Sequence, residues 1–404
     1  MLKRLLNITI TISLLLALGS CGNSDDPTPP APKEVHRTVL VYMVADNNLG
    51  SDYRFDQADM NEMLKGAQAG ALNGGRLLIY RNRPGTNSGN TPQLLEVTPE
   101  GIIELKTYPD DPSIYSVAAD RMREVIADMK TTAPAREYGM VFWGHATSWL
   151  THPTDLEGRK NAPRKRSYGT DRNKWMSLPT LGKVLSGERF CFLYFDCCLM
   201  GTVEVAYELR QVAPYIVASP TELEGEGMPY DRNLGPFFET GAPDLVTAAK
   251  NTFELYNSRA RGTCQMVVIK TDGLQRLADC SREIFKTQTS FPEGLSSVQE
   301  LSRTHRGLLP STSTCSDCHP VYDMENYMEV LTAGHPDLMA EWETALDATV
   351  VYKATTAREF TGITVERYCG LGSYVVRLAD HGDYHGYTTT QWWSDVVSKA
   401  PVLN

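Results

Sequence analysis

The chain carries a cysteine and a histidine, Cys198 and His145, each directly after an apolar run that is typical of a buried strand. They lie roughly 50 positions apart, a separation seen between nucleophile and base in one class of cysteine peptidases. A thiol attacks a carbonyl as its thiolate, so it needs a base within reach. An imidazole on a neighbouring strand can take that proton and later return it to the leaving amine. The pair therefore predicts peptide-bond hydrolysis by a cysteine nucleophile.

Two neighbours of the cysteine have opposite predicted positions. In an extended chain Asp196 and Cys198 point to the same side, whereas Cys197 points away and is expected to pack in the core. A carboxylate beside a thiol raises the thiol pKa unless a cation compensates, and a substrate Arg or Lys supplies that cation. We therefore expect Asp196 to form the floor of a pocket for a basic side chain. Main-chain N–H groups after Cys198 and beside His145 are candidate donors to the oxyanion.

A sheet is needed to hold such side chains at one edge, and strand-like and helix-like segments alternate along the chain. The alternation predicts an α/β fold with a mainly parallel sheet covered on both faces. Strands are expected in 38–45, 75–83, 138–145, 192–200, 215–218, 265–270 and 369–376, with a hairpin over 94–105. Helices are expected in 60–69, 113–130, 202–212, 243–259, 273–286, 322–331 and 388–397. The carboxyl ends of parallel strands then form the edge where such sheets bind ligands.

Composition narrows the class of partner. Of 404 residues, 42% are hydrophobic and 22% are charged, which is ordinary for a globular protein. A net charge of −10 argues against nucleic acid as a partner and favours basic substrates. The nine cysteines are too sparse for a disulfide scaffold in a chain of this length. Peptides or proteins are the expected partners.

The first residues predict export and an anchor. Lys3 and Arg4 precede an apolar segment, 5–18, that is too short to span a membrane, and Gly-Ser-Cys follows it. The arrangement resembles a bacterial lipobox, which implies cleavage before Cys21 and lipidation of its thiol; an ordinary signal peptide with an incidental cysteine is the alternative. The expected location is the bacterial cell envelope, with a lipid anchor in the membrane. The predicted organisation is a signal peptide over 1–20, a lipidated tether over 21–36 and a peptidase domain over 37–404.

Four blocks of sequence carry a resemblance to a known family. In order along the chain they read YMVADNNL, FWGHATSW, FDCCLMGTVEVAYEL and VASPTELEGEGMPYD. In these blocks the chain resembles the clostripain family, cysteine peptidases of caspase-like fold that cleave after Arg or Lys. The similarity runs from about His36 to the C-terminus and is weaker in the last third. It implies a three-layer α/β/α sandwich and an endopeptidase that cleaves after Arg or Lys.

The family pattern implies a role for each matching residue. His145 becomes the general base, Cys198 the nucleophile, and Asp196 part of the pocket for the basic residue before the scissile bond (the S1 pocket for P1). Two positions depart from the pattern, because Ala146 replaces a glycine and Cys197 replaces an alanine. Alanine still supplies an N–H to the oxyanion unless its position needs a positive φ. These departures keep a second interpretation open, a catalytically inactive caspase-fold lipoprotein that binds peptides or proteins.

Two polar segments have alternatives that the sequence leaves open. The resemblance places the acidic, glycine-rich loop 219–230 against the substrate, where Glu222, Glu224 or Glu226 would hold a basic side chain; a solvated loop face is the alternative. Asp46-Asn47-Asn48 follows the first expected strand. This cluster would cap the next helix, bind a cation or hold the active-site loops, and capping is favoured.

A long loop over 151–174 contains two basic clusters, Arg159-Lys160 and Arg164-Lys165-Arg166. Its composition suits an exposed segment that a protease can accommodate. Members of the resembled family mature by internal cuts, so self-cleavage is expected after a basic residue between Arg159 and Arg166. A merely solvated basic loop is the alternative.

The residues themselves require no cofactor and predict no metal site. Clostripain itself depends on calcium, so the resemblance introduces calcium as a cofactor without assigning it to a residue. Cys315–His319 has the C-x-x-C-H form of a haem c attachment site. A single copy without a haem-sized helical module favours a short-range disulfide or two free thiols instead.

Overall fold

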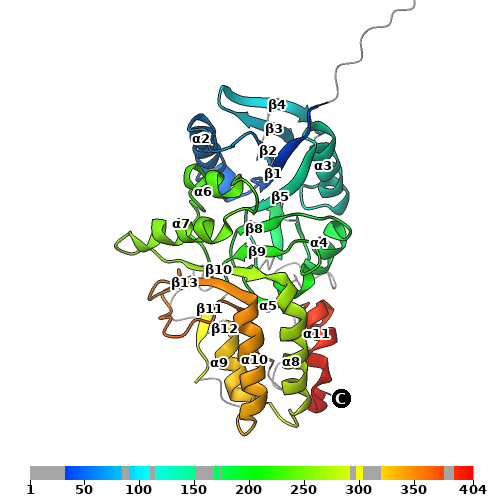
Figure 1. Cartoon of the computed structure of the whole chain (residues 1–404), viewed down its shortest axis with the longest axis vertical. Helices are drawn as coiled ribbons and strands as arrows, with labels where there is room; N and C mark the ends of the chain where they lie inside the picture. Colours follow the sequence, from blue (N-terminus) through cyan, green and yellow to red (C-terminus); the bar gives the residue numbers. More distant parts are fainter. Residues whose placement is uncertain are drawn as a thin grey trace, which may run out of the picture. The chain divides into compact units, whose positions relative to one another are not determined.

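The computed structural model describes residues 32–83, 91–109, 114–150, 167–172, 174–291, 297–303, 320–376 and 386–403. Residues 33–404 form one compact unit, apart from residues 1–32. Within the described part of that unit, nine strands form a single sheet in the order β13-β10-β9-β8-β5-β1-β2-β3-β4 (Figure 1).

The middle of this sheet is parallel. Its strands are β9 (Tyr215–Ala218), β8 (Phe192–Asp196), β5 (Ala135–Trp143), β1 (Val35–Val44) and β2 (Arg76–Asn82). Antiparallel strands extend both sides: β10 (Gln265–Lys270), β13 (Val350–Thr355), β3 (Gln93–Thr98) and β4 (Gly101–Thr107). The middle strands are buried apolar runs, as a sheet covered on both faces requires. The predicted α/β fold with a mainly parallel sheet is confirmed.

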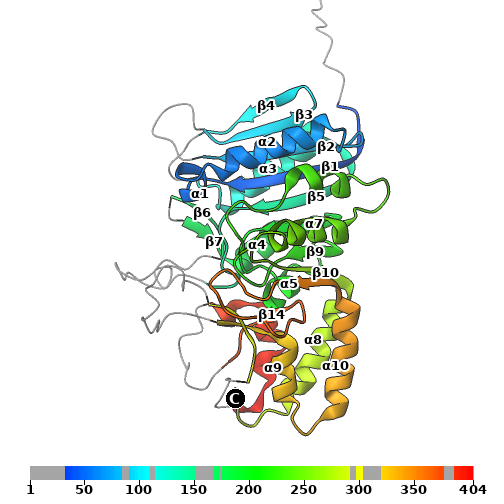
Figure 2. The same cartoon turned by 90° about the vertical axis from the view of Figure 1, so that its left-hand side faces the viewer.

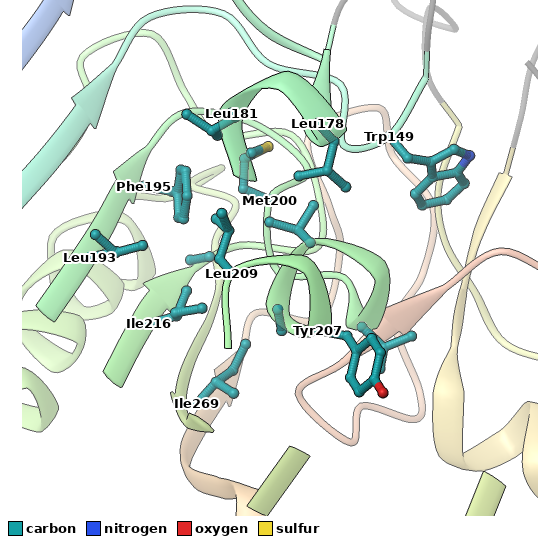
Figure 3. Packing of buried hydrophobic residues seen from close by; sticks show 14 of the residues in the cluster. Trp149, Leu178, Leu181, Leu193, Phe195, Met200, Tyr207, Leu209, Ile216 and Ile269 are labelled. Carbon is teal, nitrogen blue, oxygen red and sulfur yellow. The ribbon is translucent and has the colours of Figure 1, made fainter. Parts of the chain in front are cut away.

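Helices cover both faces of the sheet, and a hydrophobic core lies on each side of it (Figure 1). One core is closed by α2 (Phe55–Gln68), α6 (Tyr230–Phe237) and α7 (Leu245–Asn257). The other is closed by α3 (Ala119–Thr132), α4 (Leu178–Leu185) and α5 (Val203–Glu208). Along β8, side chains alternate between the two cores, and Figure 3 shows Leu193 and Phe195 on the α4–α5 side.

The remaining elements follow β10 or lie beside the carboxyl ends of the parallel strands (Figure 2). The helices are α8 (Leu274–Lys286), α9 (Met324–Leu331), α10 (Pro336–Thr349), α11 (Gln391–Asp395) and the short α1 (Asn48–Ser51). Small sheets consist of β11 (Glu300–Arg303), β12 (Pro320–Asp323) and β14 (Gly372–Ser373), and of β6 (Tyr168–Asp171) and β7 (Lys174–Met176). Short 3-10 turns occupy Thr271–Gly273, Tyr387–Thr389, Val397–Lys399 and Pro401–Leu403.

Several element boundaries differ from the sequence prediction for identifiable reasons. The helix expected from residue 113 begins at Ala119, because the backbone of Ser116 bonds to other groups: its N–H donates to Asp171 and its carbonyl accepts from the Tyr42 hydroxyl. The strand expected over 369–376 is reduced to two paired residues, although the run is buried. Gly370, two residues before β14, adopts a φ of +102°, so extended pairing begins only after it. Strands β9 and β10 have the predicted bounds, and the sequence analysis assigned no element to α10.

Candidate active site

The register of two parallel strands brings His145 and Cys198 to the same edge of the sheet. Trp143 at the end of β5 pairs with Asp196 at the end of β8. His145 and Cys198 each lie two positions beyond that pair, at the carboxyl end of their strands. This is the edge at which open parallel sheets place ligands. A further bond ties the two tips together, since the hydroxyls of Ser148 and Thr202 lie 2.7 Å apart.

The histidine tip is a tight turn that starts at a glycine. Gly144 has a φ of +136°, and a Cβ there would lie 3.1 Å from the carbonyl oxygen of Val44. His145 follows it and is half-buried; its Nε2 lies 2.7 Å from Oδ1 of Asn48 on α1. The His145 carbonyl accepts from the N–H of Gly169 at 2.7 Å, which fixes the backbone of the turn. These two hydrogen bonds hold the imidazole ring and the backbone of His145, respectively.

Ala146 occupies its position without strain. It forms a bridge with Tyr168, its side chain is 3% exposed, and positive φ values in this turn fall on Gly144 and Ser148 instead. The glycine-to-alanine departure is thus tolerated by the backbone. Its N–H remains a candidate oxyanion donor.

The cysteine tip is a strained turn. Leu199, directly after Cys198, has a φ of +65°, a left-handed conformation that costs a non-glycine residue about 1 kcal/mol or more. The turn is held by two backbone bonds to the segment that follows β9: Leu199 N–H donates to the Thr221 carbonyl at 2.9 Å, and Gly201 N–H donates to the Ser219 carbonyl at 2.7 Å.

The two adjacent cysteines lie in different surroundings. Cys197 is 2% exposed and packs in the core under α4 and α5, as strand alternation predicts. Cys198 is half-buried, and the N–H of Leu223 lies 3.4 Å from its Sγ. Burial raises the pKa of the Cys198 thiol to about 12, with smaller contributions from the negative charges of Glu222 and Asp196. The thiol is therefore neutral at physiological pH and depends on a base to become a nucleophile.

Asp196 lies behind the nucleophile as a buried carboxyl group. Its side chain is 5% exposed; Oδ1 accepts from the Met228 N–H at 2.9 Å and Oδ2 from the Tyr230 hydroxyl at 3.0 Å. A Cβ at Gly227 would come within 2.7 Å of the carboxylate, so only glycine fits there. Burial raises the pKa of Asp196 to about 7, against the lowering effect of these two hydrogen bonds. A cation beside it would restore the carboxylate form.

A second buried carboxyl group, Asp59 of α2, accompanies Asp196. The Nε1–H of Trp143 donates to its Oδ2 at 2.6 Å. Burial, and next to it the charge of Asp196, raise the pKa of Asp59 well above its usual range. Since Trp143 is the strand partner of Asp196, the two acids share one side of the sheet edge. The site therefore contains two buried carboxyl groups, those of Asp59 and Asp196.

The three glutamates of the acidic loop differ in their surroundings. Glu222 is half-buried, and its charge acts on Cys198. Glu224 and Glu226 share one cation: their carboxylates lie 3.3 and 3.4 Å from Arg259 Nη1. Of the predicted substrate-binding glutamates, Glu222 is therefore beside the nucleophile, whereas the charge of Glu226 is partly balanced.

Some predicted sites lie outside the described residues: Cys21, the basic loop with Arg159 and Lys160, and the Cys315–His319 motif. Among the described residues, no three His, Cys, Asp or Glu side chains gather as they would around a metal ion. A search of the same residues finds no helix that is both long enough and apolar enough to cross a membrane.

Sequence reasoning missed three residues of this site: Asn48, Asp59 and Leu199. Asn48 was included in a polar cluster for which capping was favoured, and Asn47 is the actual cap of α1. Asp59 belongs to α2, which begins at Phe55, five positions before the expected start at residue 60. No feature of the sequence marks Leu199, because a leucine does not signal a positive φ.

Comparisons with known proteins agree with this geometry. The model of the clostripain family matches residues 41–392. The chain is similar to a solved structure described as an inactive zymogen C11 protease from Parabacteroides distasonis, with 28% identity, a TM-score of 0.75, and coverage of 90% of this chain and 99% of that one. It is also similar to a secreted C11 cysteine protease from Bacteroides thetaiotaomicron in complex with an irreversible peptide inhibitor, with 26% identity, a TM-score of 0.71, and coverage of 89% and 98%. No match was found among curated protein sequences.

Proposed function

The chain belongs to the clostripain family of cysteine peptidases, and on that premise we propose that it cleaves peptide bonds after Arg or Lys through a Cys198–His145 dyad. The observation that carries the proposal is the strand register. In this register His145 and Cys198 each lie two positions beyond the Trp143–Asp196 pair, so Asp196 is two residues before the thiol. Membership shows the reaction class, a cysteine endopeptidase.

The reaction proceeds in two halves. His145 takes the proton of Cys198 as Sγ attacks the carbonyl carbon. The N–H of Ala146 is the candidate donor to the oxyanion, because the N–H groups of Leu199 and Gly201 already donate to the carbonyls of Thr221 and Ser219. Collapse expels the amine, which leaves with the proton from His145, and a thioester remains on Cys198. Water then loses a proton to His145 and attacks the thioester. The second collapse releases the carboxyl product and returns the proton to the thiol.

Selectivity for Arg or Lys is supported by uncompensated acid at the site. Asp196 receives hydrogen bonds from Met228 and Tyr230 but faces no cation that the structure describes within bonding distance. The guanidinium or ammonium group of a P1 Arg or Lys would supply that cation through a charge-assisted hydrogen bond. The same cation would reduce the negative field at Cys198 and so lower the thiol pKa. Substrate binding and activation of the nucleophile would then be one event.

The inactive, peptide-binding alternative is favoured by one observation, the high pKa of the Cys198 thiol. Fluorogenic peptides that differ only at P1 (Arg, Lys, Leu or Asp) test both proposals, with wild type, Cys198→Ala and His145→Ala in parallel. Hydrolysis restricted to P1 Arg and Lys, and lost in both variants, supports the dyad. Equal turnover of P1 Leu or Asp contradicts the specificity, and binding without turnover by wild type establishes the alternative. Each assay is run with calcium and with EDTA, which tests the proposed dependence on calcium.

We further propose self-cleavage between Arg159 and Arg166. The described residues that flank the loop are tied together: the Ser167 hydroxyl donates to the Leu150 carbonyl at 2.9 Å. A cut in the loop would therefore leave both fragments joined through the paired strands β5 and β8. N-terminal sequencing of purified wild type and Cys198→Ala decides it. An intact wild type, or an equally nicked Cys198→Ala, contradicts self-cleavage.

We propose lipidation of Cys21 from the pattern of the first residues alone, and the lipid would anchor the enzyme to the cell envelope. The secreted relative from Bacteroides thetaiotaomicron is consistent with export. Mass spectrometry of the N-terminal peptide from membrane fractions, beside a Cys21→Ser control, measures the acyl group. A soluble, unacylated wild type would contradict the anchor.

A further inference from the structure

The strongest unassigned contact at the site joins His145 to the first strand's tip. Nε2 of His145 lies 2.7 Å from Oδ1 of Asn48, a residue that neither strand of the dyad carries. Asn48 is exposed and opens α1, which follows β1, and β1 pairs with β5 directly. Three consecutive positions of the sheet edge, β1, β5 and β8, therefore contribute one polar side chain each.

The local structure aims Asn48 at the histidine. Both polar atoms of the side chain of Asn47, the residue just before it, are already hydrogen-bonded. Its Oδ1 accepts from Leu49 N–H, and its Nδ2 donates to the carbonyls of Val44 and Thr170, each at 2.9 Å. Gly50 lets the turn close onto β1, because a Cβ there would lie 2.2 Å from the Ala45 carbonyl oxygen. The anchored cap and the close turn leave Asn48 in a fixed place.

We propose that Asn48 is a positioning residue for His145, an inference that rests on the proposed dyad. An amide oxygen only accepts, so the bond requires that Nε2 carry the proton. In the neutral ring Nδ1 is then the basic nitrogen, and it is the nitrogen that takes the proton of Cys198. When the ring becomes an imidazolium in the transition state, the same amide oxygen stabilises the charge on Nε2–H.

This role predicts an effect on kcat rather than on substrate binding. Asn48→Ala should lower kcat about tenfold, the effect of one solvent-exposed hydrogen bond that strengthens in the transition state, with KM unchanged. Asn48→Asp keeps the acceptor and should recover part of kcat at alkaline pH. Its negative charge favours the imidazolium, so the acid limb of the pH–rate profile should move upward by about one pH unit. Asn61→Ala, an exposed asparagine on α2, is the matched control and should change neither.

A second measurement does not depend on turnover. Long-range ¹H–¹⁵N spectra of histidine-labelled protein, with His145 assigned by its loss in His145→Gln, report which ring nitrogen is protonated. We expect the Nε2–H form in wild type and in Asn48→Asp, and a mixture of both forms in Asn48→Ala. Unchanged melting temperatures would show that the variants fold.

The outcomes separate this inference from the proposed function. If wild type is active and His145→Gln is not, but Asn48→Ala keeps full kcat or wild type shows Nδ1–H, the positioning role is wrong and the dyad stands. If His145→Gln retains activity, the dyad is wrong, whatever the ring spectrum shows. If Asn48→Ala and Asn48→Asp lose kcat equally and without a shift of the acid limb, the residue acts only as a structural part of the turn.

Discussion

The two tips of the active edge differ in the surroundings that they give to their reactive side chains. The histidine tip is held by hydrogen bonds: a glycine makes the turn, a neighbouring strand fixes the carbonyl of His145, and an exposed amide contacts its ring. The cysteine tip is also held by backbone hydrogen bonds, but Leu199 takes a left-handed conformation there, and burial, with smaller contributions from Glu222 and Asp196, raises the pKa of the Cys198 thiol and keeps it protonated. One tip is ready to accept a proton, whereas the other resists giving one up.

Because of this difference, we expect the ionisation of the Cys198 thiol to control catalysis. A permanently ionised thiol would be open to alkylation and oxidation. A neutral thiol beside buried carboxyl groups becomes a nucleophile only when a cationic group binds nearby and a base is already within reach. Under the proposed specificity, a basic substrate side chain would meet that need, and specificity would then be a condition of reactivity and not only of binding.

The largest expected effect comes from the thiol itself. Cys198→Ala should lower kcat/KM by at least about 1,000-fold, because no other group can form the thioester. Cys197→Ala is the matched control: it removes the same atom one residue away, from the core under α4 and α5, and should cost stability rather than chemistry. Peptide hydrolysis and thermal melting of both variants test this. A dead Cys197→Ala that melts like wild type would show that the register is misassigned.

The next effect concerns Asp196. Asp196→Asn should lower kcat/KM for P1 Arg peptides by roughly 100-fold, because a desolvated carboxylate–guanidinium contact is lost. The pKa of about 7 adds a sign: below it the acid is neutral, so preference for P1 Arg over its neutral isostere citrulline should rise as pH increases through 7. The ratio of the two kcat/KM values cancels the titration of His145. A ratio that is flat with pH in wild type would contradict the role of Asp196.

The sequence predicted the parts of the site that follow from strand periodicity. The α/β fold, the edge shared by His145 and Cys198, and the inward position of Cys197 all follow from apolar runs and two-residue alternation. What it missed depends on contacts between distant segments. Asn48 meets His145 across 97 positions of sequence, and the burial of Asp196 depends on the covering segment of Met228 and Tyr230. No local pattern encodes either contact. The roles of these residues stay predictions until the variants are measured.

The histidine tip can be tested by disturbing its turn. Gly144→Ala places a side chain at a φ of +136° and within 3.1 Å of the Val44 carbonyl oxygen, so either the backbone or β1 must move. The strain of such a conformation is about 1–3 kcal/mol, and a small displacement of His145 should lower kcat about tenfold. Gly187→Ala, at a surface turn with a φ of +88° and open space around it, carries similar strain far from the site. Similar losses of kcat in both variants would mean that stability, not the position of His145, was measured.

The smallest expected effect is the most specific to the contrast between the tips. Glu222 contributes to the raised pKa of Cys198, second only to burial, whereas Glu226 pairs with Arg259 and makes no such contribution. Glu222→Gln should therefore lower the thiol pKa, and a shift of about half a unit makes the thiolate fraction about threefold larger at a fixed pH below that pKa. The rate at which iodoacetamide labels Cys198, followed by mass spectrometry of its peptide at pH 8, should rise by that factor. Glu226→Gln serves as the matched control and should leave the rate unchanged. Because the measurement needs no substrate, it reports the effect of nearby charge on the thiol directly. Equal labelling rates in wild type and Glu222→Gln would mean that burial alone keeps Cys198 neutral and that the charge of the acidic loop does not raise the thiol pKa.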